Sequence, residues 1–535
     1  MTVFEAFLES AQKYPDHEFL CIPPQSDRHY YPDGIEFSFS ELRERVLVLR
    51  EKYQNAGYGM GHRVALLLEN RPEHIMHFLA LNSLGAGIVP VNPEYRHDEM
   101  LYQMEHSEAE LVVSVADRIA DLKTVAVERE KPLALMNGED LPAHFPPPSK
   151  KAQSGSPVPD TEACLFYTSG TTGRPKGCIC TNFYFLNAGH WYANMGGRLH
   201  INPETERLYN PLPLFHMNAG AISLMCMMLT GGCLIIPDRF HPKSWWKEIK
   251  ATDATIVHYL GVVPPLLLNQ DEVPEEKQHQ VKFGLGAGVE PELHDPFEER
   301  FGFPLVEIWG MTETGRLFGD HIEPRRTTTR AFGIPYGIFE AKITDEQDLE
   351  VPREQPGELL VRCAGNNPRM GFFSGYLKNE QATEEAWRGG WFHTGDVVRQ
   401  GADGMLYFVD RQKNIIRRSG ENIAAAEVEA VLQVHKKVAQ IAVIAVPDEL
   451  REEEVMACVV LMPGIHGEKA VAEDLFAWCS ERLAYFKAPG WILFLDALPT
   501  TGTQKVQKTR IFPDKVDPRR QAGIFDFRQQ KRKRR

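Results

Sequence analysis

Short, continuous apolar runs recur along the N-terminal part of the chain, each bounded by turn or helix signals. They lie at residues 64–68, 111–113, 163–166, 234–236, 255–257 and 305–308. A continuous run is typical of a strand that is buried on both faces of a parallel sheet. Amphipathic stretches separate the runs. The pattern therefore predicts an α/β fold in which helices cover both faces of the sheets.

One amphipathic stretch near the N-terminus carries a complete helix-start signal. Ser38 and Glu41 have the spacing of a capping box, in which each side chain bonds the backbone of the other residue. Apolar residues then follow on one helical face, namely Leu42, Val46, Leu49 and Tyr53. We expect a helix that begins at this signal and buries that face.

The pattern changes between Phe339 and Phe408, where short strands alternate with glycine turns, as in residues 357–362. This change predicts a small β-rich subdomain. Residues 142–159, rich in proline and serine, are typical of a loop, and a helical stretch at 427–432 opens a further domain. With 535 residues the chain is too long for a single core, so we expect a large N-terminal region and at least one further domain.

Composition and charge narrow the classes of function. The formal net charge of -14 argues against general nucleic-acid binding, because phosphates would be repelled by most of the surface. The N-terminus lacks a basic segment followed by an apolar one, and no long uncharged apolar run follows, so secretion and membrane spanning are not expected. The nine cysteines are scattered, and the spacing of Cys178 and Cys180 fits no zinc pattern. We expect free thiols in a reducing cytoplasm.

The chain ends on a basic run, Lys531-Arg532-Lys533-Arg534-Arg535. Such a run is either a targeting or anionic-surface signal or a solvated, frayed terminus. The second interpretation is favoured.

The string YTSGTTGRPKG at residues 167–177 has the composition of a phosphate-binding loop. Hydroxyls stand at Thr168, Ser169, Thr171 and Thr172, glycines at Gly170, Gly173 and Gly177, and a positive charge at Lys176. Glycines let the backbone turn tightly, so that its N–H groups approach oxyanions. The loop follows the apolar run 163–166, which places it at the carboxyl end of a strand, where α/β folds bind ligands. A Walker loop does not fit, because the position five after Gly170 is Pro175.

The full string resembles the phosphate-loop signature of the adenylate-forming superfamily, which includes acyl-CoA synthetases, firefly luciferase and the adenylation domains of peptide synthetases. Four further motifs follow in the order of that family, so the resemblance covers essentially the whole chain. Pro213-Leu214-Phe215-His216 resembles the aromatic-histidine segment beside the acyl site. The resemblance implies that His216 helps to close the acyl pocket and meets the carboxylate of the substrate.

Residues 307–314, EIWGMTET, resemble the adenine and magnesium segment of the family. The resemblance implies that Trp309 offers a flat face to adenine, and that Glu313, together with Thr168, holds Mg²⁺ through hard oxygen atoms. It also implies nucleotide contacts from Glu307, Gly310, Met311 and Thr312, and from a strand-end turn at Gly286, Ala287 and Gly288.

Arg316 lies three residues beyond Glu313 and has two interpretations. In the first interpretation, the Arg316 side chain lies at the inner end of the acyl pocket, where it would bind a second polar or anionic group of the substrate. Alternatively, it pairs with Asp320 at the surface.

The remaining motifs lie in the C-terminal third of the chain. Residues 391–396, WFHTGD, resemble the ribose segment, in which Asp396 accepts both ribose hydroxyls. The resemblance further implies that Arg411 binds the ribose and phosphates, Lys413 is a hinge, and Gly420 leaves room for the pantetheine arm of CoA. Residues 498–506, LPTTGTQKV, resemble the loop with the catalytic lysine, here Lys505. Many relatives have glycine directly before that lysine, where this chain has Gln504.

Together these motifs imply an ATP-dependent acyl-CoA ligase that uses Mg²⁺ and CoA and acts on a small carboxylic acid in the cytoplasm. The implied fold is a large N-terminal domain, residues 1–412, with two doubly wound α/β subdomains and a small β-rich one, followed by a small mobile α+β domain, residues 413–535. Lys505, His216, Glu313 and Thr168 are the implied catalytic residues. The segments 408–411, 420–423 and 450–453 are similar to the carnitine- and crotonobetaine-CoA ligase subgroup.

Two other interpretations stay open at this point. The chain could pass its acyl group to a carrier protein or another acceptor, or it could be a non-catalytic nucleotide-binding regulator. The second is disfavoured, since the magnesium glutamate, the ribose aspartate, the hinge and the terminal lysine are all present. The sequence names neither the acid nor the oligomeric state, and a homodimer is compatible with it.

Overall fold

The computed structural model describes residues 1–168, 175–411, 414–418, 421–448, 451–483, 485–500, 506–513 and 516–531. The chain forms two compact units. The first contains Met1–Glu340 and Arg362–Trp391, and the second contains Ala341–Val361 and Phe392–Arg535. The predicted domain boundary at Lys413 lies outside the described residues and stays a prediction.

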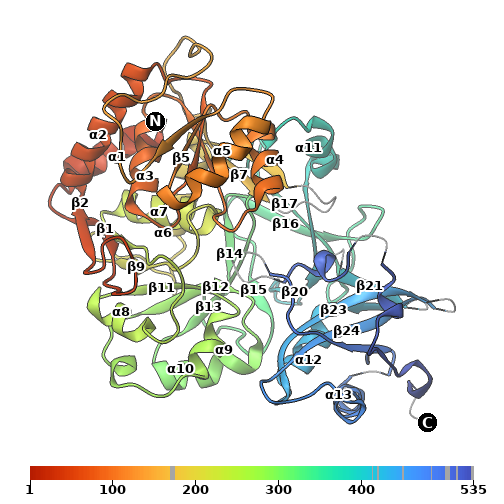
Figure 1. The fold of residues 1–535 in the computed structure, drawn as a ribbon. Helices are drawn as coiled ribbons and strands as arrows, with labels where there is room; N and C mark the ends of the chain where they lie inside the picture. Colours follow the sequence, from red (N-terminus) through yellow and green to blue (C-terminus); the bar gives the residue numbers. More distant parts are fainter. Residues whose placement is uncertain are drawn as a thin grey trace. The chain divides into compact units, whose positions relative to one another are not determined.

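Two largely parallel sheets form the framework of the first unit (Figure 1). The larger sheet has the order β14-β13-β12-β11-β9-β10-β1-β2. Its strands are β1 (Glu18–Ile22), β2 (Ile35–Ser38), β9 (Arg207–Tyr209), β10 (Cys233–Ile235), β11 (Ile256–Leu260), β12 (Phe283–Ala287), β13 (Leu305–Gly310) and β14 (Leu317–Gly319). Only its outer pairs β1/β2 and β13/β14 are antiparallel among the pairs described.

The second sheet of this unit has the order β18-β8-β7-β4-β3-β5-β6. Its strands are β3 (Arg63–Leu67), β4 (Gly87–Pro90), β5 (Leu111–Ser114), β6 (Ala134–Asn137), β7 (Glu162–Thr168), β8 (Lys176–Thr181) and β18 (Gly375–Tyr376). A further short strand of the unit is β15 (Ala331–Gly333). Every predicted apolar run overlaps one of the strands in these two sheets, because such runs bury both faces of a strand.

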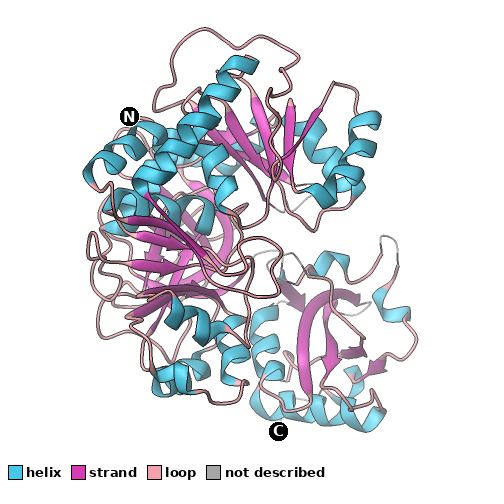
Figure 2. Cartoon of the chain, turned by 60° about the vertical axis from the view of Figure 1, so that its left-hand side comes forward, coloured by secondary structure: helices cyan, strands magenta, loops and turns pink. Residues whose placement is uncertain are grey.

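Helices lie on both faces of each of these sheets (Figure 2). They are α1 (Val3–Lys13), α2 (Phe39–Ala56), α3 (Pro72–Asn82), α4 (His97–Ser107), α5 (Ile119–Glu128), α6 (Asn182–Ala193), α7 (Leu224–Thr230), α8 (Trp245–Ala251), α9 (Val263–Leu268), α10 (His294–Phe301) and α11 (Glu380–Ala386). The capping box that starts α2 is confirmed: Glu41 N donates to Ser38 Oγ at 3.2 Å, and Ser38 N donates to Glu41 Oε2 at 2.9 Å. The predicted apolar face of α2 is buried.

The second unit is α+β. Its strands β20-β19-β17-β16 form one group, and β22-β21-β24-β25-β26, with β23 against β24, form another. The described pairs are antiparallel except β24/β25, which is parallel. The bounds are β16 (Phe339–Thr344), β17 (Gly357–Cys363), β19 (Phe392–Gln400), β20 (Leu406–Arg411), β21 (Ile415–Arg418), β22 (Glu421–Ala424), β23 (Val438–Asp448), β24 (Glu452–Leu461), β25 (Trp491–Phe494), β26 (Phe525–Asp526), α12 (Ala425–Gln433) and α13 (Lys469–Arg482). Both helices pack their apolar faces into one core with β23, β24 and β25. The predicted fold class is confirmed.

The basic C-terminal run begins inside the second unit rather than in solvent. Lys531 is buried, and its Nζ lies 2.5 Å from Glu454 Oε1 and 2.9 Å from the carbonyl oxygen of Phe486. Glu454 is fully buried and also accepts from Arg418 Nε, at 2.8 and 2.9 Å. The tail is drawn inward because Phe527 packs into the core and β26 pairs with β25. The predicted frayed terminus is therefore wrong for Lys531, while residues 532–535 lie outside the described part.

Glu454 should be the most sensitive polar position of this unit. Replacing Glu454 by glutamine leaves two buried cations facing a neutral amide, which should lower the free energy of unfolding by about 3–5 kcal/mol. Burial lowers the pKa of Lys531 to about 8, and the Glu454 carboxylate limits that fall because it favours the charged amine. Hydrogen exchange of the β24 and β25 amides measures the loss locally.

The matched variant is Lys531→Met, which leaves the Arg418–Glu454 pair intact and should cost less than half as much. If Lys531→Met accelerates exchange as strongly as Glu454→Gln, the carboxylate is not the centre of the cluster.

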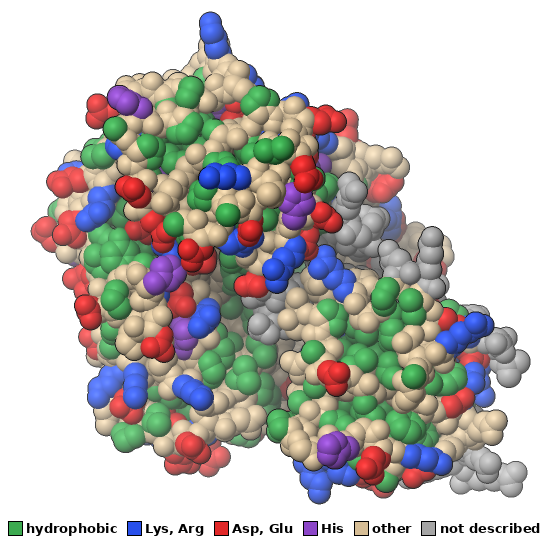
Figure 3. All heavy atoms as spheres, in the orientation of Figure 1, with side chains coloured by type: hydrophobic (Ala, Val, Ile, Leu, Met, Phe, Trp, Pro, Cys, Tyr) green, Lys and Arg blue, Asp and Glu red, His purple; other side chains and the backbone are tan. Residues whose placement is uncertain are grey.

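Two predictions from composition, on the cysteines and on membrane spanning, can be compared with the structure. All nine cysteines are among the described residues, and all are buried and free, as expected. None of the described helices has both the length and the apolarity needed to cross a bilayer. On the face shown in Figure 3, acidic and basic side chains are interspersed.

Candidate active site

The phosphate loop connects the strand β7 to its antiparallel neighbour β8. Thr168 is the last residue of β7, Lys176 is the first residue of β8, and the two are partners in the ladder. The loop therefore follows the carboxyl end of β7, as predicted. Ser169, Gly170, Thr171 and Thr172 lie outside the described residues.

Glu313 lies beside the two ends of this loop. Glu313 is 5% exposed, and its Oε1 accepts a hydrogen bond of 2.9 Å from the hydroxyl of Tyr376. The ammonium of Lys176 lies over the ring of that tyrosine, 4.6 Å from its centre. The thiol of Cys178 lies 4.0 Å from Thr168 Oγ1, and its pKa is raised chiefly by burial and further by the Glu313 carboxylate. The structure thus brings Thr168, Lys176 and Glu313 together.

This cluster has the chemistry of a magnesium–phosphate site. A carboxylate and a hydroxyl are hard oxygen donors, and a lysine complements phosphate charge. Among the described residues no group of three or more His, Cys, Asp or Glu side chains forms a metal cage. Magnesium in nucleotide sites is held by one or two protein carboxylates, by substrate phosphates and by water, so the residues present fit that ion.

The predicted adenine segment lies at the carboxyl ends of β12 and β13. Gly286 and Ala287 end β12, and Gly286 is the partner of Glu307 in the ladder. The N–H of Gly288 donates to Glu307 Oε2 at 2.7 Å, and Tyr259 Oη donates to Glu307 Oε1 at 2.8 Å. Burial raises the pKa of Glu307 to about 7. A Cβ at position 286 would collide with the ring and carbonyl of Tyr259, which explains the glycine.

The chain between Glu307 and Glu313 contains the other predicted nucleotide contacts, which are Trp309, Gly310, Met311 and Thr312. Trp309 is 6% exposed, and its ring packs on Phe318, with 5.7 Å between ring centres. Gly310 is exposed at the end of β13. Stacking of adenine on Trp309 stays a prediction.

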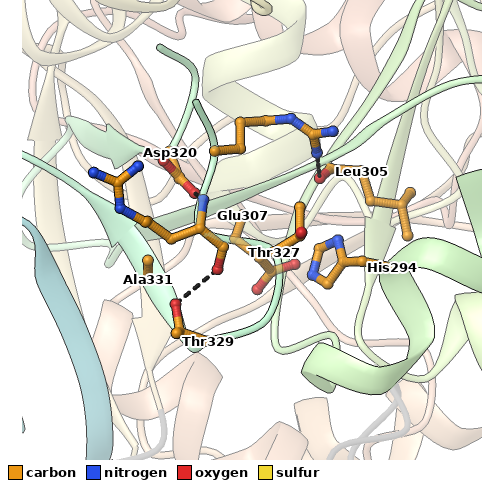
Figure 4. Close-up of a pocket in the computed structure, with 9 residues that line it drawn as sticks. His294, Leu305, Glu307, Asp320, Thr327, Thr329 and Ala331 are labelled. Atoms are coloured by element: carbon orange, nitrogen blue, oxygen red, sulfur yellow. Dashed lines mark hydrogen bonds between the residues drawn. The ribbon is translucent and has the colours of Figure 1, made fainter. Parts of the chain in front are cut away.

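A small polar cavity lies against Glu307 (Figure 4). It has a volume of about 10 Å³, close to that of a single water site. Both ring nitrogens of His294, and Asp320 Oδ1, are buried there with no hydrogen-bond partner in the described part of the chain. Polar groups of this kind are normally satisfied by an ordered water.

His216 lies elsewhere in the first unit, after β9. Its ring is 4.6 Å from that of Phe215, and both line a cavity of about 20 Å³. The other lining residues are Pro90, Asn92, Tyr95, Gln103 and Tyr167. Tyr167 directly precedes Thr168, so His216 borders the entry to the phosphate loop.

Asp396 and Arg411 belong to the second unit and face each other across β19 and β20. Arg411 Nε lies 3.4 Å from Asp396 Oδ1, and Asp396 is 5% exposed. A carboxylate beside a guanidinium suits the paired hydroxyls of a ribose and an adjoining phosphate. Lys413, Gly420 and Lys505, predicted for the hinge, the pantetheine path and the α-phosphate, lie outside the described residues.

Comparison with known proteins decides the family. The family model for AMP-binding enzymes matches residues 7–377, and the model for the C-terminal domain of these enzymes matches residues 427–505. The chain belongs to the AMP-binding enzyme family. The first match ends just beyond Tyr376, and the second ends on Lys505, so together they span both units.

Three proteins to which this AMP-binding enzyme is similar are CoA ligases or synthetases. The crotonobetaine/carnitine–CoA ligase of Proteus mirabilis is 31% identical over 495 residues, which cover 89% of this chain and 93% of the relative. The o-succinylbenzoate-CoA synthetase of Bacillus subtilis, solved with its acyl-adenylate intermediate, is 25% identical with a TM-score of 0.80 and covers 95% of this chain and 98% of its own. The benzoate-CoA ligase of Burkholderia xenovorans, at 20% identity and a TM-score of 0.80, covers 95% of this chain and 99% of its own and shares the fold. The chain is an adenylate-forming acid–CoA ligase by family.

Arg316 of this ligase does not lie at the surface. It is fully buried, and its guanidinium donates to the carbonyl oxygen of Met370 at 2.7 Å and to Asn187 Oδ1 at 3.1 Å. Asp320 instead accepts from the backbone N–H of Arg326. The interpretation of Arg316 as a surface partner of Asp320 is therefore wrong.

Sequence reasoning missed Tyr376, which contacts both Glu313 and Lys176. The residue lies in a two-residue strand, β18, far from either contact along the chain. The sequence held one local signal, a tyrosine after the segment Phe372-Phe373-Ser374-Gly375, but nothing in the spacing connects it to the phosphate loop.

Proposed function

We propose that this ligase joins a small carboxylic acid to CoA in two half-reactions at one nucleotide site. In the first, a carboxylate oxygen attacks the α-phosphorus of ATP and diphosphate leaves, which gives an acyl adenylate. In the second, the thiol of CoA attacks the acyl carbon, loses its proton and expels AMP. The cluster of Thr168, Lys176 and Glu313 at the carboxyl end of β7 is the observation that carries this proposal. The proposal includes a cytoplasmic location, and the nine free thiols support it because a reducing compartment keeps thiols unpaired.

The predicted residues of the metal, phosphate, ribose and acyl positions, the hinge and the CoA path each have a task in this scheme. Glu313 and Thr168 would hold Mg²⁺, which when bound neutralises charge on the phosphates. Lys176 and the loop hydroxyls would hold the phosphate oxygens, and Asp396 and Arg411 the ribose side. Lys505 would stabilise charge on the α-phosphate, while His216 would close the acyl pocket. Lys413 would act as the hinge and Gly420 would border the pantetheine arm.

CoA is the proposed acceptor rather than a carrier protein, because the relatives named above are CoA ligases. Release of AMP and diphosphate, measured with and without CoA, tests this. Turnover that depends on CoA is the expected result, whereas a slow burst that CoA does not accelerate would favour another acceptor. A panel of short, branched, aromatic and betaine-type acids in the same assay identifies the substrate class.

Asp396 should govern affinity for ATP and not for the acid. Asp396→Ala should raise the KM for ATP by about tenfold or more, because two ribose hydroxyls lose a charged acceptor. The KM for the acid should stay within about twofold of its wild-type value. Steady-state kinetics with each substrate varied in turn check this, and an unchanged KM for ATP would refute the assignment.

A further inference from the structure

Tyr376 connects parts of the first unit that lie far apart in sequence. Its hydroxyl donates to Glu313 Oε1 at 2.9 Å, and its ring supports the ammonium of Lys176 at 4.6 Å. A cation over an aromatic face is attracted by the ring's electron density. One side chain thus contacts both the carboxylate and the lysine of the phosphate cluster.

The backbone of Tyr376 is fixed on both sides. β18 pairs with β8, where Tyr376 faces Cys178, and the N–H of Leu377 donates to the carbonyl oxygen of Gly177 at 2.8 Å. The N–H of Tyr376 donates to Thr383 Oγ1 at 2.9 Å, which ties the strand to α11. The position of the hydroxyl is therefore set by the same strand that begins with Lys176.

The segment that carries Tyr376 also holds the main chain of Glu313. The N–H of Phe373 donates to the carbonyl oxygen of Glu313 at 2.9 Å. The buried guanidinium of Arg316 binds the carbonyl oxygen of Met370 at 2.7 Å, which anchors the start of this segment. Backbone and side chain of Glu313 are thus both held by residues 370–376.

The tyrosine hydroxyl is the donor in its hydrogen bond to Glu313, because a carboxylate oxygen only accepts. A protonated hydroxyl limits the rotation of the carboxylate that it bonds. A hydrogen-bond partner of a metal-binding side chain orients that side chain, so that it does not have to move when the metal binds.

We propose that Tyr376 is a positioning residue for adenylation: its hydroxyl orients the Glu313 carboxylate toward magnesium–ATP, and its ring supports Lys176 beside the phosphates. The inference rests on the proposed function and adds to it a residue that acts through two others. The two parts of the side chain have separable tasks. The hydroxyl acts on the metal ligand, and the ring acts on the lysine.

Direct binding of metal and nucleotide tests these tasks without knowledge of the acid. The probes are Mn²⁺, followed by electron paramagnetic resonance in the presence of a non-hydrolysable ATP analogue, and the analogue alone, followed by calorimetry. Tyr376→Phe should weaken Mn²⁺ binding about tenfold and leave metal-free binding of the analogue unchanged. Tyr376→Leu should weaken both, since Lys176 also loses its support. Tyr336→Phe is the matched control, because the buried Tyr336 hydroxyl has no hydrogen-bond partner in the described residues.

The outcomes separate this inference from the proposed function. Wild-type protein that binds Mn²⁺ and analogue, with Tyr376→Phe indistinguishable from it and from Tyr336→Phe, overturns the role of Tyr376 alone. Equal weakening of Mn²⁺ and metal-free analogue by Tyr376→Phe, with a lowered Tm, also overturns it, because that pattern is a structural loss. Wild-type protein that binds neither probe overturns both proposals.

Discussion

Replacing Lys505 by alanine should abolish formation of the acyl adenylate and leave thioester formation intact. The resemblance places this lysine on the α-phosphate, where its charge would stabilise negative charge that develops as diphosphate leaves. Loss of such a donor costs on the order of a hundredfold or more in rate. ATP–diphosphate exchange measures the first half-reaction, and conversion of supplied acyl adenylate plus CoA measures the second. The exposed Lys469 on α13 offers a matched control, Lys469→Ala, which should keep both.

Lys413→Pro should give the reverse pattern. A proline fixes φ at the predicted hinge and would hold the C-terminal domain in its adenylating orientation, so the thiol could not reach the adenylate. Both variants must keep a native Tm. Equal loss of both half-reactions in each variant would contradict the alternating-domain mechanism, and Gln504 beside Lys505 would be the first residue to test for the reason.

Replacing Glu313 by glutamine should be nearly as severe. The substitution keeps the shape and removes the charge that would hold Mg²⁺ next to Thr168 and Lys176. We expect the rate of adenylation to fall by about a hundredfold or more, because charge on the transferring phosphorus would lose its metal support. Thioester formation from supplied acyl adenylate should change by less than about threefold.

The matched control for Glu313→Gln is Glu380→Gln, at an exposed position in the first turn of α11. It removes the same charge from the same unit and should leave both half-reactions near wild type. A Glu313→Gln variant that adenylates normally would show that the cluster at the end of β7 is not the phosphate site.

Elements with a strong local signal could be predicted from the sequence. The capping box at Ser38 fixes the start of α2, and the continuous apolar runs mark strands of two sheets because both faces of those strands are buried. The phosphate loop after β7 could be placed because a cluster of glycines and hydroxyls after a buried strand is typical of a phosphate-binding loop. In these cases the residues that determine the element lie within the element or a few positions from it.

Features set by long-range contacts could not be predicted. Lys531 looks solvated in a basic tail, but Phe527 and β26 draw it to Glu454. Arg316 looks like a surface partner of Asp320, but the arginine is buried and bonds Asn187 and Met370 instead. Tyr376 meets Glu313 only because β18 pairs with β8, and no spacing in the sequence reports that pairing.

The central claim, that an acyl adenylate forms at this site, is tested most directly by an oxygen label. The acid that is active in the panel is prepared with ¹⁸O in its carboxylate and incubated with ATP, Mg²⁺ and CoA, and the products are analysed by mass spectrometry. Attack of the carboxylate on the α-phosphorus predicts that each AMP carries one labelled oxygen and that the diphosphate carries none. Label in inorganic phosphate, with ADP as the nucleotide product, would show an acyl phosphate route and contradict the account.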